Sequence, residues 1–185
     1  MDTTEYLRQV VQELSQTVEL ISNDNAELLV NHILEANKIF VAGAGRSGFM
    51  GKSFVMRMMH MGIDAYIVGE TVTANLEKGD LLIIGSGSGE TKTLIAIAEK
   101  AKNIGGTIAA VTISPDSTIG RSADIVVKLP GATKEHSDGD YKTIQPMGSL
   151  FEQTMLLFYD ALILRFMEKK GLDSKKMYGK HANLE

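Results

Sequence analysis

The chain has 185 residues, of which 44% are hydrophobic and 23% are charged. These values are typical of one globular domain and exclude the disordered and collagenous classes of protein. The formal net charge is -4, and no cluster of Lys and Arg forms the basic face that nucleic-acid binding requires. The absence of cysteine excludes disulfides, thiolate zinc sites and redox chemistry on sulfur.

No segment approaches the ~20 apolar residues that a membrane-spanning helix needs. The N-terminal residues also lack the basic and apolar regions of a signal peptide. We therefore expect a cytoplasmic protein that has a small-molecule ligand and neither a membrane nor a nucleic-acid partner.

Two helices are predicted before any strand. Apolar residues recur at helical spacing from Tyr6 to Ile21, which indicates an amphipathic helix. Asp24 and Glu27 have the spacing of a capping box and predict that a second helix runs from about Asn25 to Ala36. Residues 1–36 would therefore form an N-terminal helical pair.

Short apolar runs then alternate with helical patterns. The predicted strands are Lys38–Ala42, Ala65–Val68, Leu81–Gly85, Thr107–Ile113 and Asp124–Leu129, and the predicted helices between them are Ser47–Met61 and Thr91–Lys102. Continuously apolar strands that are joined by helices are typical of a parallel sheet covered on both faces. We therefore expect a single α/β domain whose sheet core spans residues 38–129.

The last part of the chain contains a loop, a helix and a tail. Residues 130–147 are rich in turn formers and predict a long loop, in which Asp138 and Asp140 form a turn rather than a calcium site. The helix predicted at 149–170 is apolar on nearly every side, so it is either central to the fold or an oligomer interface. The tail, 171–185, is polar.

The first strand-to-helix loop, Gly43-Ala44-Gly45-Arg46-Ser47-Gly48, matches the dinucleotide pattern G-x-G-x-x-G. Glu70, after the second strand, would then be the acid that binds the ribose. A tight turn explains the glycines equally well, but it does not explain Arg46 and Ser47. A dinucleotide oxidoreductase is an alternative for which the sequence offers no second domain to bind the substrate.

The second loop, Gly85-Ser86-Gly87-Ser88-Gly89-Glu90-Thr91, also follows a buried strand and precedes a helix. Backbone N–H groups and three hydroxyls would meet at a helix N-terminus, which favours an anion. The loop lacks the G-K-[ST] ending of a nucleotide P-loop, so a monophosphate is a better ligand than ATP. Ordinary N-capping by Ser88 or Thr91 is the alternative interpretation.

Two glycine-rich loops that are suited to phosphate binding follow strands of one parallel sheet. This arrangement favours one compact phosphorylated ligand at a topological switch point. Four segments then resemble the sugar isomerase (SIS) domain family, and closely its 6-phospho-3-hexuloisomerase branch. They are VAGAGRSGFMGKSF, GSGSGET, QPMGSLFEQ and KHANLE. The resemblance covers essentially the whole chain.

The resemblance implies a flavodoxin-like or Rossmann-like fold with a five-stranded parallel sheet in a three-layer α-β-α sandwich. It implies a homotetramer that needs no metal and no organic cofactor. The implied reaction moves a sugar-phosphate carbonyl between C3 and C2 in the ribulose monophosphate route of formaldehyde fixation. Such a step requires a base that carries a proton through a cis-enediol.

The resemblance also assigns residues. Glu152 would be the base, and His181 would move protons at the sugar oxygens or open the fructose ring. The polar tail that carries His181 can reach a neighbouring subunit. The expected substrate- and phosphate-binding residues are Gly45, Arg46, Ser47, Ser86, Gly87, Ser88 and Thr91.

A competing interpretation of Glu152 is a capping box with Ser149, in which the helix start would leave the carboxylate a weak base. The neighbouring Leu150 and Phe151 could restore basicity by excluding water. Glu90, at a helix start, and Glu70, without an identified partner, are poorer bases.

His60 is expected to be a packed or interface residue, and His32 and His136 carry no functional signal. Two further functions stay open. One is another aldose-ketose phosphate isomerase of the family, of the arabinose 5-phosphate type. The other is a non-catalytic sugar-phosphate sensor, which would normally carry an output domain.

Overall fold

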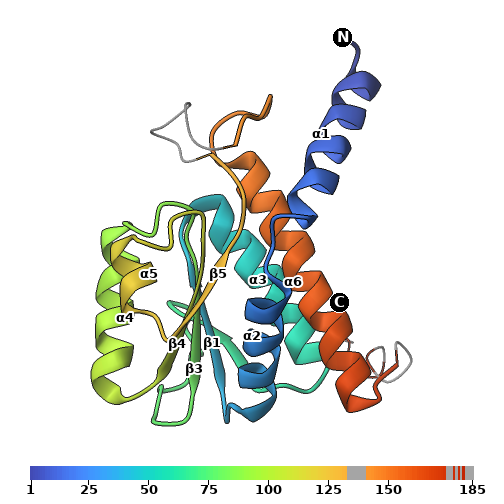
Figure 1. Ribbon diagram of the computed structural model, residues 1–185. Helices are drawn as coiled ribbons and strands as arrows, with labels where there is room; N and C mark the ends of the chain where they lie inside the picture. The colour runs from blue at the N-terminus through green and yellow to red at the C-terminus, as the bar shows by residue number, and fades with distance from the viewer. Residues whose placement is uncertain (133–140, 174–176, 178, 180, 182–185) are drawn as a thin grey trace.

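The computed structural model describes residues 1–132, 141–173, 177, 179 and 181. Their helices and strands form three layers, with one sheet between two sets of helices (Figure 1). The predicted Asp138–Asp140 turn, His136 and most of the KHANLE segment lie outside the described residues.

The sheet has five strands, and every pairing between neighbours is parallel. The strands are β1 (Ile39–Gly43), β2 (Ala65–Ile67), β3 (Leu81–Gly85), β4 (Thr107–Thr112) and β5 (Ile125–Lys128). Each predicted strand agrees with the structure to within one residue at each end. The order β2-β1-β3-β4-β5 is that of flavodoxin-like folds, which places the topological switch point between β1 and β3.

Helices cover both faces of the sheet, as predicted. One layer contains α2 (Asn23–Glu35), α3 (Gly45–His60) and α6 (Ser149–Lys170), and the other contains α4 (Lys92–Ile104) and α5 (Thr118–Ser122). Each layer packs against the sheet through its own cluster of buried apolar residues. Helix α1 (Thr3–Val18) extends away from this body beside the start of α6 (Figure 1).

The apolar helix α6 is central to the fold. It contacts α1, α2 and α3, and most of its large apolar side chains are buried or half-buried, whereas Leu157 and Leu164 are exposed. Burial on several sides explains why the sequence of α6 lacks a single apolar stripe. None of the described helices is both long and apolar enough to cross a membrane.

The first two helices begin at caps that differ from the prediction. Helix α1 starts at Thr3 rather than Tyr6, because Asp2 and Glu5 form a capping box in which each carboxylate accepts the other's backbone N–H. The predicted Asp24–Glu27 capping box is wrong. Ser22 caps α2 instead, and its hydroxyl accepts the N–H of Asn25 at 3.4 Å.

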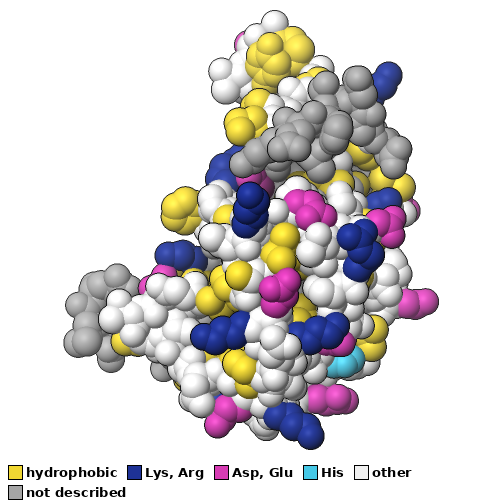
Figure 2. Space-filling view, turned by 90° about the vertical axis from the view of Figure 1, so that its left-hand side faces the viewer, with side chains coloured by type: hydrophobic (Ala, Val, Ile, Leu, Met, Phe, Trp, Pro, Cys, Tyr) yellow, Lys and Arg dark blue, Asp and Glu magenta, His cyan; other side chains and the backbone are white. Residues whose placement is uncertain are grey.

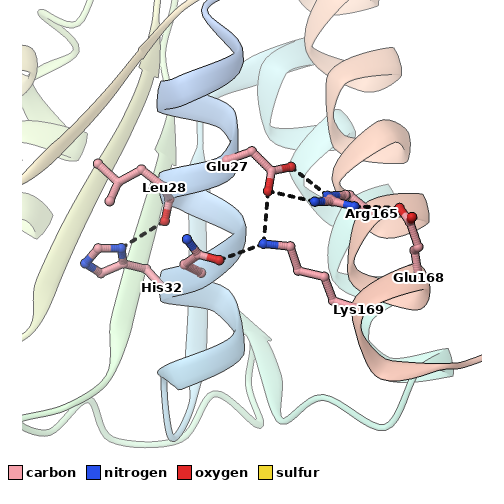
Figure 3. A network of polar contacts seen from close by, with 7 residues as sticks. Glu27, Leu28, His32, Arg165, Glu168 and Lys169 are labelled. Carbon is pink, nitrogen blue, oxygen red and sulfur yellow. Dashed lines mark hydrogen bonds and ion pairs between the residues drawn. The ribbon is translucent and has the colours of Figure 1, made fainter.

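Glu27 binds across the helical layer rather than along its own helix (Figure 3). Its carboxylate accepts from the Nε atom of Arg165 at 2.7 Å and lies 2.9 Å from the Nζ atom of Lys169. Lys169 also donates to the side chain of Asn31. The hydrogen bonds from Arg165, followed by that from Lys169, lower the pKa of Glu27 from 4.5 to about 2. The network therefore ties α2 to α6.

We expect this network to stabilise the protein in a pH-dependent way. Because the pKa of Glu27 is lower in the folded than in the unfolded protein, its contribution is complete above pH 4.5 and is lost as pH falls toward 2. The contribution should be modest, since the carboxylate is 30% exposed and solvent screens the pair. The thermal unfolding temperature of Glu27→Gln should be below that of the wild type at pH 6, and the difference should become clearly smaller at pH 3, because the contribution is lost as pH falls toward 2.

Glu99→Gln, on the exposed side of α4, is the matched control and should show no such convergence. A gap between Glu27→Gln and the wild type that stays constant from pH 6 to pH 3 would contradict the assignment.

Candidate active site

A cavity of about 950 Å³ opens beside the carboxyl ends of the central strands. Its walls come from the β1–α3, β3–α4 and β4–α5 loops and from the start of α6. This is the switch-point edge of the sheet, where open α/β folds bind their ligands. The two glycine-rich loops therefore face one shared space, as the sequence predicts.

The β1–α3 loop brings Gly45 and Ser47 to the cavity. Gly45 has a φ of +57°, which L side chains rarely adopt, and no atom lies near the position of a Cβ. A Cβ on Gly48 would lie 2.8 Å from the carbonyl oxygen of Gly43. The glycines thus serve the turn and the close approach of helix to strand, and Ser47 is the polar side chain that this loop offers to a ligand.

The β3–α4 loop brings Ser86, Gly87, Ser88 and Thr91 to the same cavity. Ser86 is buried, and its hydroxyl accepts the N–H of Gly89 at 3.2 Å. The Ser88 hydroxyl accepts the N–H of Glu90 at 3.3 Å, so it stabilises the loop and does not cap the helix. Thr91 is the N-cap residue of α4, but its side chain makes no capping hydrogen bond. The N-capping interpretation of these hydroxyls is therefore wrong.

Thr91→Val should separate ligand binding from helix stability. Because the hydroxyl makes no cap bond, the melting temperature should stay within about 2 °C of the wild type. If the hydroxyl binds phosphate, losing one donor should weaken inorganic phosphate binding by about 2- to 13-fold. Isothermal titration calorimetry measures this, with Thr93→Val on the exposed side of α4 as the control. Unchanged phosphate affinity in Thr91→Val would remove this residue from the site.

Glu152 lines the cavity with a side chain that is only 8% exposed. Its Oε2 atom accepts a hydrogen bond from Nη1 of Arg46 at 2.7 Å, and the same nitrogen donates to the hydroxyl of Ser149 at 3.0 Å. The competing interpretation of Glu152, a capping box with Ser149, is wrong, because Gly148 is the N-cap residue of α6 and no side chain caps this helix. The carboxylate is instead held by a guanidinium at the edge of the cavity.

Arg46 was predicted to bind the substrate directly. Its guanidinium is directed at Glu152, and Arg46 is not among the residues that line the cavity. The structure thus joins two predicted site residues that lie 106 positions apart in the sequence.

The two competing acids have other partners. Hydrogen bonds from Thr118, the backbone N–H first, lower the pKa of Glu90, whose Oε1 atom lies 2.7 Å from that nitrogen. Glu90 therefore stays ionised and weakly basic, as its position predicts. Glu70 does have a partner, because Lys52 lies 2.7 Å from its carboxylate.

His181 does not line the cavity of its own chain. Its ring stacks on that of His60, with 5.1 Å between the centroids. His60 is the last residue of α3, and Gly45 at the cavity is the first, so the two ends are roughly 22 Å apart. His60 is buried, as expected, and its pKa is lowered by desolvation and then by the charges of His181 and Arg57.

The sequence analysis missed a third part of the cavity wall. Ser114, Asp116 and Ser117 in the β4–α5 loop and Lys128 at the end of β5 all line the cavity. This loop contains no glycine motif and has the composition of an ordinary turn. The available signal was its position, because the carboxyl ends of parallel strands meet at one edge of the sheet.

Comparisons with known proteins agree with this geometry. A family model described as SIS domain matches residues 32–162. The chain is 60% identical over 185 residues to the 3-hexulose-6-phosphate isomerase of Bacillus subtilis (strain 168), with 100% of both chains covered. It is 36% identical over 184 residues to the protein of the same name from Mycobacterium gastri, covering 100% of this chain and 92% of that relative.

A solved structure from Methanococcus jannaschii superposes with a TM-score of 0.85 and 36% identity, covering 98% of this chain and 99% of that one. That crystal structure is described as inferring a molecular function of 3-hexulose-6-phosphate isomerase. The match to the SIS domain model extends over the sheet, both glycine-rich loops and most of α6. On these grounds the chain belongs to the SIS domain family.

Proposed function

We propose that the chain is an isomerase that interconverts 3-hexulose 6-phosphate and fructose 6-phosphate through a cis-enediol. The observation that carries this proposal is the buried carboxylate of Glu152 in the same cavity as the hydroxyl-bearing loop of residues 85–91. A phosphate bound by the loop would hold an open-chain sugar against the carboxylate. The full-length similarity to 3-hexulose-6-phosphate isomerase supports the choice of sugar.

The reaction needs one base and a second group that moves protons between oxygens. The Glu152 carboxylate takes the proton from C2 of the 3-hexulose, the electron pair of the C–H bond forms the C2–C3 double bond, and O3 gains a proton. The enediol then loses the proton on O2, the C2 carbonyl forms, and Glu152 returns its proton to C3. Arg46 holds the carboxylate in place by its hydrogen bond.

The proposed role of His181 requires a second subunit. Within one chain the ring stacks on His60 at the end of α3 that is remote from the cavity. In a homotetramer that end can lie against the cavity of a neighbour, where His181 would transfer protons at O2 and O3. We propose this cytoplasmic assembly for the ribulose monophosphate route of formaldehyde fixation, with no metal or organic cofactor.

Exposed apolar side chains on α1 and α3 support an assembly. Figure 2 shows hydrophobic side chains at the upper, protruding end of the molecule, where α1 lies. The exposed residues are Tyr6, Leu7, Val11 and Val18 on α1 and Phe49, Met56 and Met59 on α3. Stripes of this kind mark protein-protein contacts.

We expect light scattering to give a mass near four times the 20.1 kDa of one chain. Leu7→Glu combined with Val11→Glu should shift the protein to smaller species, because two charges would be buried in the contact. Ile104→Glu, at an exposed apolar position on α4, should leave the mass unchanged. A fully active wild-type monomer in dilute buffer would refute both the assembly and the shared role of His181.

The function is tested by giving the purified chain a panel of sugar phosphates in the presence of EDTA. We expect conversion of fructose 6-phosphate to the 3-hexulose and no comparable turnover of arabinose 5-phosphate. Preferred turnover of arabinose 5-phosphate would assign the chain to the other isomerase type. Tight binding of the whole panel without turnover would identify a sensor.

A further inference from the structure

The cavity wall carries more acidic than basic side chains, although the proposed ligand is an anion. A sugar phosphate carries about two negative charges at neutral pH. Three acids line the cavity, namely Glu90, Asp116 and Glu152, and Lys128 is the one Lys or Arg in the described part of the wall. Backbone N–H groups at the start of α4 attract the phosphate, but the surrounding carboxylates repel it.

Arg46 does not supply the missing charge in this arrangement. Its Nη1 atom already donates to Glu152 at 2.7 Å and to Ser149 at 3.0 Å. Moving the guanidinium to a phosphate would leave the Glu152 carboxylate, which is 8% exposed, without its charged partner, and an unpaired buried charge is costly. The cation for the phosphate should therefore be a different side chain.

Lys128 meets this requirement. It is the last residue of β5, and its Cα pairs in register with that of Thr112 on β4. Lys128 is exposed, and no hydrogen bond or ion pair joins its side chain to any described residue. An ammonium group without a protein partner can bind a ligand without breaking an existing contact.

The position of Lys128 also fits the second loop. The hydroxyl of Thr112 donates to the carbonyl oxygen of Gly87 at 3.1 Å, so the strand end beside Lys128 is bonded directly to the β3–α4 loop. The strands β3 and β5 are separated by β4 alone, which puts them about 9.6 Å apart. The four-carbon stem of a lysine and a bound phosphate group together span such a gap.

We propose that Lys128 is the cation that binds the substrate's phosphate, opposite the N–H groups and hydroxyls of residues 85–91. This inference rests on the proposed function for the identity of the sugar, but not for the binding of phosphate. The cavity would then have two functional parts. Lys128 and the loop hold the phosphate, while the Arg46–Glu152 pair stays at the reacting carbons.

The test uses the full chain with Lys128→Gln, Lys128→Arg and the control Lys100→Gln, which removes the same charge from the exposed side of α4. Calorimetry with inorganic phosphate in low-salt buffer should show affinity about 10- to 100-fold weaker in Lys128→Gln. The KM for fructose 6-phosphate should rise by a similar factor, while kcat changes less than about threefold. Lys128→Arg should recover most of the affinity, and Lys100→Gln should match the wild type.

Phosphate affinity of Lys128→Gln within twofold of the wild type would overturn the proposal. A loss of kcat with unchanged phosphate affinity would overturn it as well, because Lys128 would then act at the reacting atoms. Failure of the proposed function is distinguishable, since a wild type that binds phosphate through Lys128 but isomerises no sugar would leave the inference standing. Equal melting temperatures for all four proteins exclude unfolding as the cause.

Discussion

Glu152→Gln should lower kcat by about 10²- to 10⁴-fold while KM changes little. Glutamine keeps the shape of the side chain, and its Oε1 atom can still accept the hydrogen bond that Arg46 now donates to the carboxylate at 2.7 Å. The fold and the cavity should therefore persist. What is lost is the ability to remove a proton from C2 or C3, so kcat rather than KM should report the change.

The decisive measurement is isotope exchange during turnover. In heavy water the wild type should incorporate deuterium into the sugar product, and Glu152→Gln should not. Asp160→Asn, which removes a carboxylate charge from an exposed position on the same helix, is the matched control and should keep near-normal kcat and deuterium incorporation. A Glu152→Gln protein with near-normal kcat and an unchanged circular dichroism spectrum would show that another group is the base.

Gly89→Ala should be the most damaging single methyl addition in the β3–α4 loop. Gly89 has a φ of +63°, and a Cβ there would overlap the hydroxyl of Ser117 and lie 2.5 Å from the Cβ of that residue. A left-handed backbone and a steric overlap together should destabilise the protein by roughly 2–5 kcal/mol. For a domain of this size the melting temperature should fall by roughly 4–20 °C, and phosphate binding should weaken because the loop is displaced.

The two causes can be separated with a second substitution. Ser117 is the N-cap residue of α5, and its hydroxyl accepts the N–H of Gly120. Ser117→Gly removes the two Ser117 atoms that the new methyl group would overlap, and replacing a helix cap by glycine costs only a few tenths of a kcal/mol. Gly89→Ala combined with Ser117→Gly should therefore recover the stability that the steric overlap costs. The loss of stability caused by the left-handed backbone should remain. A double variant that is no more stable than Gly89→Ala would show that the overlap is relieved in some other way.

The sheet could be predicted from the sequence because its central strands β1, β3 and β4 are buried on both faces. Leu81–Gly85 is apolar without interruption and ends in a glycine-rich loop, so its type and its limits are both clear. Helix starts were less predictable. Asp2 and Ser22 cap α1 and α2, but Asp24 and Glu27 have an equally good capping pattern, and only the tertiary contact with Arg165 shows where Glu27 binds.

The candidate site could be predicted where motifs are local. Ser47 and the 85–91 loop line the cavity as the sequence predicts. The Arg46–Glu152 ion pair could not be foreseen, since it depends on how α6 packs beside α3. Lys128 was missed for the same reason. Only the folded positions of the neighbouring loops show that this lysine at a strand end lines the cavity.

The separation of functional residues along α3 has a consequence for mixed assemblies. In each chain Glu152 binds Arg46 in the first turn of this helix, and His181 stacks on His60, its last residue. If a working centre combines Glu152 of one subunit with His181 of another, a protein lacking Glu152 and a protein lacking His181 are defective in different halves of the same centre. Dissociating the two inactive proteins together and reassociating them would then create some centres with both residues intact. Activity would return by complementation between two chains that are each inactive alone.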